Sequence, residues 1–266
     1  MKYYTYISGA CGGIGKAFTV LCAKKGYDLF LTGRSSERLE KLKAEISEIS
    51  ESMGAEIITY PCDLTDENSR RKMLEFIDEN GIKFDRIINV AGVDTQKPFM
   101  DYTADKILFQ IRVNAESTVY MTHALLLRRA ENTEVITISS MSGVSPMPYF
   151  ALYSATKAML TNFFTSLHYE LKNEGVKITV VLPGGVPTRE DIIADIKSQG
   201  LAGKLSSKPA AYVAEKSLLA VKKNKIKYIP GAFNKFLNVL MNIAPKRIVL
   251  KYIAKRWKKS AGKDAF

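Results

Sequence analysis

A tyrosine and a lysine four positions apart are the residues best suited to chemistry in this 266-residue chain. Tyr153 and Lys157 fall in a stretch that we expect to be helical, so their side chains share one face. A phenol has a pKa of about 10 and is a poor proton carrier near pH 7. A nearby ammonium in a partly desolvated cleft would lower that pKa, and Ser140, after a predicted strand, could hydrogen-bond a reacting oxygen. An isolated pair of this kind is more often a packed ring beside a solvated cation. The surrounding motifs must therefore show whether this pair is catalytic.

A glycine-rich segment near the N-terminus, Ser8 to Gly15, has the elements that a nucleotide diphosphate needs. It follows a predicted strand and opens a predicted helix. Glycines permit the tight turn and the close approach of a pyrophosphate, and the helix N-terminus favours negative charge. An NAD site usually carries an acid at the end of the next strand, where this chain has Gly33 followed by Arg34. The cation favours the 2′-phosphate of NADP(H); the alternative is that Arg34 is a solvated loop residue.

Strand-like and helix-like segments alternate along the chain and must position these residues. We predict strands at 3–8, 27–32, 55–60, 84–90, 133–139, 177–182 and 225–229, with mostly helical segments between them. Ser35 would cap the helix over 35–53, and Thr65 the helix that ends before Gly81. Strands separated by helices indicate right-handed crossovers and a parallel sheet. The prediction is an α/β fold: a single doubly wound Rossmann-type domain (1–230) with a seven-stranded parallel sheet, and a helical basic C-terminal extension (231–266).

The composition excludes several classes of protein. With 46% hydrophobic and 25% charged residues the chain is neither disordered nor coiled-coil, and no 18-residue apolar stretch indicates a membrane span. The first eight residues read as a strand and not as a signal peptide, and three cysteines, Cys11, Cys22 and Cys62, are too few for a disulfide framework. We expect a cytoplasmic protein. No Cys/His/Asp cluster has metal-ligand spacing, so we expect no metal.

Several short motifs together resemble those of the short-chain dehydrogenase/reductases. They are the glycine segment, Asn89-Val90-Ala91-Gly92, Val113-Asn114-Ala115, Ser140, Tyr153-x-x-x-Lys157 and Pro183-Gly184-Gly185-Val186-Pro187-Thr188. The segments 31–35 and 229–235 are similar to the branch near 3-oxoacyl-CoA reductases and 17β-hydroxysteroid dehydrogenases. Within the fourth-strand motif, Val90 replaces a second Asn, which removes an amide that often ties this strand to its neighbours.

The resemblance implies a role for each matching position. Tyr153 would be the general acid in carbonyl reduction, Lys157 would lower its pKa and hold the nicotinamide ribose, Ser140 would orient the substrate oxygen, and Asn114 would maintain a proton-relay water. Residues implied to line NADP(H) are Gly9, Gly13, Ile14, Gly15, Arg34, Asp63, Leu64, Asn89, Ala91, Gly92, Tyr153, Lys157, Pro183, Gly184, Val186 and Thr188. Residues 188–208 would form a lid over the substrate.

The expected function is therefore an NADPH-dependent oxidoreductase that interconverts a ketone and a secondary alcohol. The expected partners are this small-molecule substrate and further copies of the chain in a homo-oligomer. The alternative is a non-catalytic NADP-binding sensor or scaffold, but both Tyr153 and Lys157 are present. A nucleic-acid binder is disfavoured, because no zinc-finger spacing or RNA-binding aromatic signature is found.

The net charge of +12 is concentrated at the C-terminal end. Residues 204–266 hold 16 Lys and Arg against two acids, whereas residues 1–203 carry a net charge of −2. A helix beginning near Pro245 would place Ile248, Val249, Leu250, Tyr252, Ile253 and Trp257 on one half and Arg247, Lys251, Lys255 and Lys258 on the other. This pattern is typical of a helix lying in a membrane interface, here peripheral at the inner face. The alternative is that the apolar half packs on the protein body, beside the substrate cleft or a second subunit.

Overall fold

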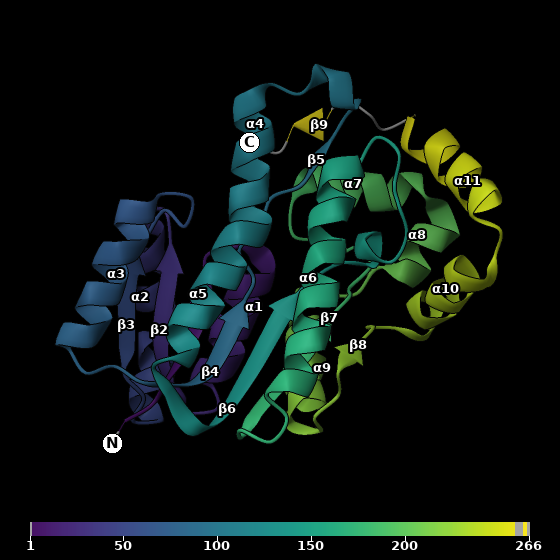
Figure 1. The fold of residues 1–266 in the computed structure, drawn as a ribbon. Coiled ribbons are helices and arrows are strands. Elements are labelled where there is room, and N and C mark those ends of the chain that lie inside the picture. The colour runs from purple at the N-terminus through teal and green to yellow at the C-terminus, as the bar shows by residue number, and fades with distance from the viewer. Residues whose placement is uncertain (1, 259–262, 265–266) are drawn as a thin grey trace.

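A seven-stranded parallel sheet forms the centre of the molecule (Figure 1). The computed structural model describes residues 2–258 and 263–264. The strands follow the order β3-β2-β1-β4-β6-β7-β8. Their bounds are β1 Tyr4–Ser8, β2 Asp28–Gly33, β3 Ile57–Pro61, β4 Phe84–Asn89, β6 Arg129–Ile138, β7 Val176–Val181 and β8 Lys227–Tyr228. The predicted fold class is confirmed, with a helical C-terminal region after β8.

Helices cover both faces of this sheet, as the crossover rule requires. They are α1 Gly13–Ala23, α2 Ser36–Ser52, α3 Glu67–Glu79, α4 Ala104–Ile111, α5 Ser117–Leu126, α6 Ala151–Glu170, α7 Glu190–Ser198, α8 Gly200–Ser206, α9 Ala210–Lys222, α10 Ala232–Ile243 and α11 Lys246–Lys258. Short turns of helix lie at Phe99–Asp101 and Met141–Gly143, and a π-helical turn spans Arg112–Glu116.

The hydrophobic core has two halves, one on each face of the sheet. On one face Met73 of α3, Leu125 of α5 and Phe164 of α6 are buried against the strands. On the other face Phe18 of α1, Leu39 of α2 and Val213 of α9 are buried. All five residues of β1 are buried, which fits a central strand that is covered on both sides. The strands are thereby fixed, and the loops at their C-terminal ends carry the motifs.

The helix starts follow local capping chemistry, with one correction to the sequence analysis. Ser35 caps α2 by accepting a hydrogen bond from the Arg38 amide at 3.2 Å. The prediction that Thr65 caps the next helix is wrong. Asp66 caps α3 by accepting a hydrogen bond from the Ser69 amide at 2.6 Å. The Thr65 hydroxyl instead donates to Asp63 at 2.8 Å, so it belongs to the preceding turn.

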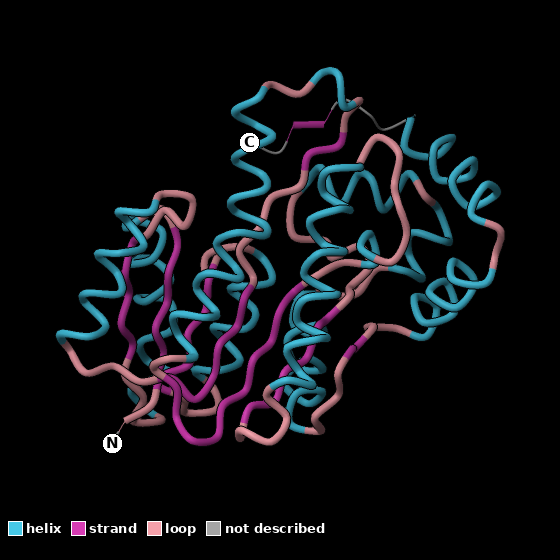
Figure 2. The backbone as a smooth tube through the Cα atoms, in the orientation of Figure 1, coloured by secondary structure: helices cyan, strands magenta, loops and turns pink. Residues whose placement is uncertain are grey.

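The C-terminal region forms two helices at the outer end of the molecule, beyond β8 (Figure 2). The chain then returns to the body, where β9 Lys263–Asp264 pairs antiparallel with β5 Thr95–Gln96. This small pairing is absent from the sequence prediction. The predicted extension of 231–266 lies in part outside the described residues. None of the helices in the described part of the chain is both long and apolar enough to cross a bilayer.

Candidate active site

The predicted catalytic side chains meet at the C-terminal ends of β6 and β7. Tyr153 and Lys157 project from the first turns of α6, and Ser140 follows β6. The Lys157 ammonium donates to the carbonyl of Ile138 at 2.9 Å and lies 5.7 Å from the centre of the Tyr153 ring. Ser140 is hydrogen-bonded to the Tyr153 side chain, and its hydroxyl also accepts from the Ser142 amide at 3.0 Å. The hydroxyl, phenol and ammonium are therefore held by both strand and helix.

The electrostatics of the pair differ from the expectation that Lys157 lowers the tyrosine pKa. Burial raises the pKa of Tyr153 above its ordinary value, and the Asp94 carboxylate raises it further; hydrogen bonding to Ser140 and the Arg189 charge act in the opposite direction. Burial lowers the pKa of Lys157 to about 8, opposed by Asp94. Desolvation is the larger influence on both groups. At neutral pH the phenol therefore holds its proton and is an acid.

Asn114 lies in the π-helical turn between α4 and α5. Its carboxamide accepts from the Val93 amide at 2.7 Å and donates to the Val93 carbonyl at 2.8 Å. It also donates to the Thr156 hydroxyl at 3.2 Å, which connects it to α6. Single π turns inside helices are frequent at functional sites, because the extra residue re-aims a side chain. Here the turn directs Asn114 towards the helix that carries Lys157.

Gly92 keeps Asn114 and Lys157 close to the end of β4. A Cβ atom at Gly92 would lie 3.2 Å from the Asn114 amide oxygen and 3.4 Å from the Lys157 ammonium. A side chain here would press on both groups. Ala91, beside it, is held by the Ser8 hydroxyl, which accepts from the Val90 and Ala91 amides at 3.0 and 3.2 Å.

Asn89 has a structural contact that the resemblance did not imply. Its amide nitrogen is buried and donates to Thr122 of α5 at 2.9 Å and to Thr137 of β6 at 3.2 Å. The nitrogen is therefore used inside the protein and ties β4 to its neighbours. We expected Val90 to remove an amide that ties β4 to its neighbours. Asn89 and Ser8 make such contacts in this structure. The lining of the adenosine side by Asn89, Ala91 and Gly92 stays a prediction.

The glycine loop has the close packing that a diphosphate site requires. Gly9 has a φ of +63°, a conformation that L side chains rarely adopt. A Cβ at Gly15 would collide with the Gly9 carbonyl, and one at Gly13 with the Thr188 side chain. Ile14 lies between these two glycines at the start of α1. The first turn of α1 therefore presents free backbone amides beside Thr188, which fits a pyrophosphate.

Two arginines flank the end of β2, where a 2′-phosphate would lie. Arg34 is exposed, with its guanidinium 5.7 Å from the centre of the Phe109 ring. Arg38, on the first turn of α2, donates to the carbonyl of Cys11 in the glycine loop at 3.1 Å. Sequence reasoning missed Arg38, although its place one turn after Arg34 was a usable signal. This pair of cations fits a phosphorylated ribose.

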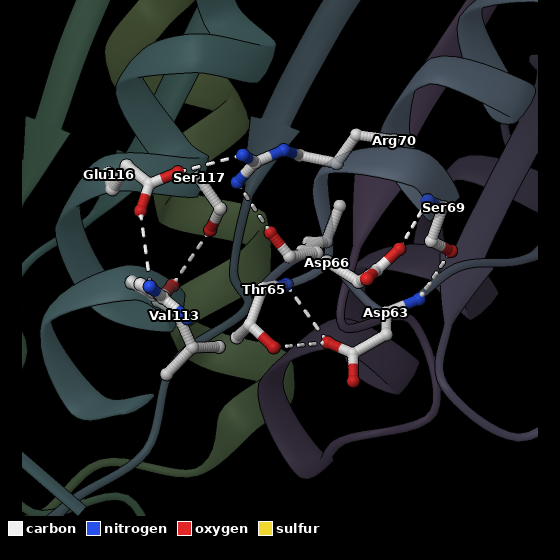
Figure 3. A network of polar contacts seen from close by, with 10 residues as sticks. Asp63, Thr65, Asp66, Ser69, Arg70, Val113, Glu116 and Ser117 are labelled. Atoms are coloured by element: carbon white, nitrogen blue, oxygen red, sulfur yellow. Dashed lines mark hydrogen bonds and ion pairs between the residues drawn. The ribbon is translucent and has the colours of Figure 1, made fainter. Parts of the chain in front are cut away.

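The loop predicted to bind adenine is joined to the Asn114 turn by a polar network centred on Arg70 (Figure 3). Asp63 accepts from the Thr65 amide and hydroxyl, which shapes the loop that contains Leu64. Arg70 of α3 donates to the Leu64 carbonyl at 2.8 Å and pairs with Glu116 at 2.7 Å. Arg70 is 5% exposed, and it crosses from α3 to the π turn. The network holds the predicted adenine loop and the Asn114 turn in fixed relation.

The segment after β7 lines the other side of the site. The Pro183 carbonyl accepts from the Met141 amide at 2.9 Å, and a Cβ at Gly184 would collide with the Ser206 carbonyl and the Asn234 side chain. Val186 is buried in the core. The predicted lid, 188–208, contains α7 and α8. Its first residues are tied to the loop after β4, because Arg189 donates to Asp94 at 2.9 Å and to Asp191 at 3.0 Å.

A cavity of about 580 Å³ opens beside Ser140 and Tyr153. Met147, Phe150 and Trp257 contribute apolar walls, and the Phe150 ring stacks on Tyr153 with centroids 4.4 Å apart. Asp94, Gln96 and Arg189 supply a polar side near the tyrosine. Asp94 and Gln96 are absent from the predicted site, because the sequence gives no spacing that would place them there, whereas Arg189 falls within the predicted lid. Among the described residues, no cluster of three His, Cys, Asp or Glu is placed to hold a metal ion.

The apolar half of α11 is divided between the body and solvent. Val249, Ile253 and Trp257 pack against Met147 and Phe150 beside the cavity. For these three residues, the alternative that the apolar half of the helix packs on the protein body beside the substrate cleft is confirmed. Ile248 and Tyr252 remain 65% and 69% exposed.

Comparison with known proteins agrees with this geometry. The model of the short chain dehydrogenase family matches residues 4–195. The chain is 33% identical over 195 residues to the very-long-chain 3-oxoacyl-CoA reductase of Bos taurus, which covers 70% of this chain and 60% of that protein. It is 28% identical over 252 residues to 11-beta-hydroxysteroid dehydrogenase-like 2 of Arabidopsis thaliana, with coverage of 93% and 80%. The matched region thus spans less than two thirds of the bovine relative's length.

Solved structures share the fold over nearly the whole chain. A structure of a 7beta-hydroxysteroid dehydrogenase superposes with a TM-score of 0.82 at 22% identity, covering 94% of this chain and 96% of that one. A short-chain dehydrogenase from Sphingobium yanoikuyae in complex with NADPH gives a TM-score of 0.73 at 23% identity, covering 92% and 97%. The protein belongs to the short chain dehydrogenase family, a family of oxidoreductase enzymes, as the sequence motifs predict.

Proposed function

We propose that the protein is an NADPH-dependent oxidoreductase that interconverts a ketone and a secondary alcohol. The observation that carries the proposal is that Ser140 and Tyr153 line a cavity of about 580 Å³, with the buried Lys157 ammonium 5.7 Å from the centre of the tyrosine ring. This volume suits a molecule of drug-like size. The short chain dehydrogenase match and the related reductase and dehydrogenases support the reaction class.

Each side chain has a defined task in carbonyl reduction. Ser140 donates a hydrogen bond to the substrate oxygen and orients it, and it keeps its own proton. Tyr153, protonated at neutral pH, transfers the phenol proton to that oxygen as negative charge develops. Lys157 places its positive charge near the phenolate that results, and Asn114 fixes the loop and helix around the lysine. In alcohol oxidation the same groups act in reverse.

The cofactor assignment is NADP(H), which supplies the hydride when bound. The residues fit it: the glycine loop offers helix N-terminal amides, and Arg34 and Arg38 lie where a 2′-phosphate would need cations. The complex of a structurally similar dehydrogenase with NADPH supports this assignment. The Asp63–Leu64 loop would hold adenine, and the Pro183–Thr188 segment would meet the nicotinamide.

Cofactor titration followed by a ketone panel tests the proposal. NADPH fluorescence should change on titration with protein, and at least one member of a panel of 3-oxoacyl thioesters, steroids and small diketones should oxidise the bound NADPH. Binding without turnover across the panel would favour the alternative of a non-catalytic NADP-binding protein. Absence of binding would contradict the proposal.

We also propose that the chain forms a homo-oligomer and associates peripherally with anionic membrane at its cytoplasmic side. The second proposal rests on exposed cations of α11, including Arg247, Lys251, Lys255 and Lys258. Each cation near an anionic surface contributes about 1 kcal/mol, strongly reduced by salt. Co-sedimentation with anionic vesicles at low salt should be lost when all four become Glu. Equal sedimentation of the variant, or none by the native protein, would refute membrane association.

A further inference from the structure

Six large apolar side chains are exposed on α10 and α11. Phe236, Val239, Leu240 and Ile243 recur at helical spacing on one face of α10, with exposed fractions of 61%, 55%, 43% and 75%. Ile248 and Tyr252, one turn apart on α11, add to them. We call these six residues the α10–α11 patch. Isolated apolar side chains are normal at a protein surface, but a group on one helical face marks an interaction site.

The patch forms the rim of the substrate cavity. Leu240, Ile248 and Tyr252 line the cavity and are also exposed to solvent. Leu237, Met241 and Ile253 continue the apolar wall inwards, and Tyr153 and Ser140 lie in the same cavity. Apolar side chains of the cavity wall therefore extend from the exposed patch into the cavity that contains Tyr153. Figure 1 shows the two helices at the outer edge of the molecule.

The charges around the patch indicate which surface it meets. Residues 232–258 contain seven cations and no acid: Lys235, Lys246, Arg247, Lys251, Lys255, Arg256 and Lys258. Within the described residues, none of the seven forms an ion pair. Arg256 is partly buried in the cavity wall, and the other six cations are exposed. Self-association through this face would set six exposed cations against six others, which disfavours a second copy. A bilayer with anionic headgroups accommodates both the cations and the apolar side chains.

We propose that the α10–α11 patch seats the cavity mouth on an anionic bilayer and that the substrate is a lipid-soluble ketone taken up directly from it. This inference rests on the proposed oxidoreductase activity. The patch inserts among the headgroups, the surrounding cations contact lipid phosphates, and the substrate passes between α10 and α11 without crossing bulk water.

The test compares two vesicle surfaces that carry the same dissolved ketone. A long-chain ketone is loaded into vesicles of phosphatidylcholine, with or without phosphatidylglycerol, at equal lipid and ketone concentrations. Uptake through water depends only on the free ketone, so it predicts equal rates after partitioning into each vesicle is measured and matched. Uptake through the patch predicts a rate about tenfold or more higher on the anionic vesicles, because binding raises the local concentration. A short water-soluble ketone should be reduced equally with both.

Variants of the patch make the test specific. Phe236→Ser with Ile243→Ser removes two exposed patch residues that do not line the cavity. This variant should lose the advantage of anionic vesicles and keep its rate with the water-soluble ketone. The matched control, Met53→Ser with Leu127→Ser, removes two exposed apolar residues elsewhere and should behave as the native protein.

The outcomes separate this inference from the proposed function. If neither ketone is reduced, the oxidoreductase proposal itself fails. If both are reduced but the long-chain ketone reacts equally fast on the two vesicle surfaces, uptake from the bilayer is refuted while the activity stands. A patch variant that keeps the full anionic-vesicle advantage would equally overturn the role of α10 and α11.

Discussion

The burial of Lys157 gives the site a specific pH dependence. Its pKa is lowered to about 8, so the ammonium is charged below that pH and loses its proton above it. Tyr153 keeps its proton through this range, because burial raises its pKa. We expect kcat/KM for ketone reduction to fall as the pH rises through about 8, since the positive charge beside the nascent phenolate disappears.

Replacement of the lysine provides the control. Arg keeps its charge throughout this range, so any residual activity of Lys157→Arg should lack the fall near pH 8. A pH profile of the Arg variant that still falls at the same pH would assign the effect to another group.

Arg34 should discriminate between the two nicotinamide cofactors. In the proposed complex its removal would delete a charge-assisted contact with the 2′-phosphate, a group that NADH does not carry. We expect Arg34→Ala to weaken NADPH binding about tenfold or more and to leave NADH binding nearly unchanged. Fluorescence titration measures both dissociation constants, with Arg71→Ala, an exposed cation on α3, as the control. Equal losses for the two cofactors would show that Arg34 does not contact the phosphate.

The residues that could be identified from sequence belong to local motifs. Tyr153 and Lys157 share a helix, and Gly9 to Gly15 share one turn, so their spacing fixes their relation. Arg189 and Asp94 are 95 positions apart and meet only because β4 and β7 lie in the same sheet. The direction of the Tyr153 pKa shift could not be predicted from the sequence either, because it depends on burial and on the Asp94 carboxylate.

At the scale of elements, α3 and the π turn are coupled through one buried side chain. Arg70 pairs with Glu116 and with the Leu64 carbonyl. Its loss leaves a buried carbonyl unsatisfied, so we expect Arg70→Met to lower the free energy of unfolding by about 2 kcal/mol. Arg71→Met is the control, because Arg71 is exposed and its pair with Glu75 at 3.6 Å contributes little.

Urea denaturation of both variants measures this difference. If the Arg70 network also holds the predicted adenine loop, NADPH binding should weaken for Arg70→Met and remain native for Arg71→Met. Equal stability of the two variants would contradict the structural role of Arg70.

Most element boundaries could be predicted because hydrophobic spacing and local capping determine them. All seven parallel strands were expected, and Ser35 caps α2 as predicted. The pairing of β5 with β9 was not expected. Strands of two residues show no hydrophobic periodicity, and this pairing joins residues about 170 positions apart in the sequence. Thr65 was assigned as a cap because it precedes the helix; Asp66 takes that role, since Asp63 already engages the threonine hydroxyl.

At the scale of the whole molecule, the helices α5 and α6 offer a surface for the proposed oligomer. Tyr120 of α5 and Met159 of α6 are 42% and 47% exposed. We expect the native mass in light scattering to be a multiple of 29.6 kDa and Met159→Lys to reduce it, because a buried unpaired charge opposes association.

A similarly exposed residue on the other face of the molecule provides the comparison. Leu219 of α9 is 44% exposed, and Leu219→Lys should leave the mass unchanged. A monomeric native protein would refute the oligomer, and loss of mass in both variants would place the interface elsewhere.

The central claim, that Tyr153 is the proton donor in ketone reduction, is tested most directly by the single-turnover rate of NADPH oxidation in Tyr153→Phe. This change removes the hydroxyl and keeps the ring that stacks on Phe150. We expect NADPH binding and folding to stay close to native, while the rate falls by about 10² or more, the scale for loss of a positioned acid. A variant that keeps more than about a tenth of the native rate, with hydride transfer rate-limiting in both proteins, would contradict the assignment.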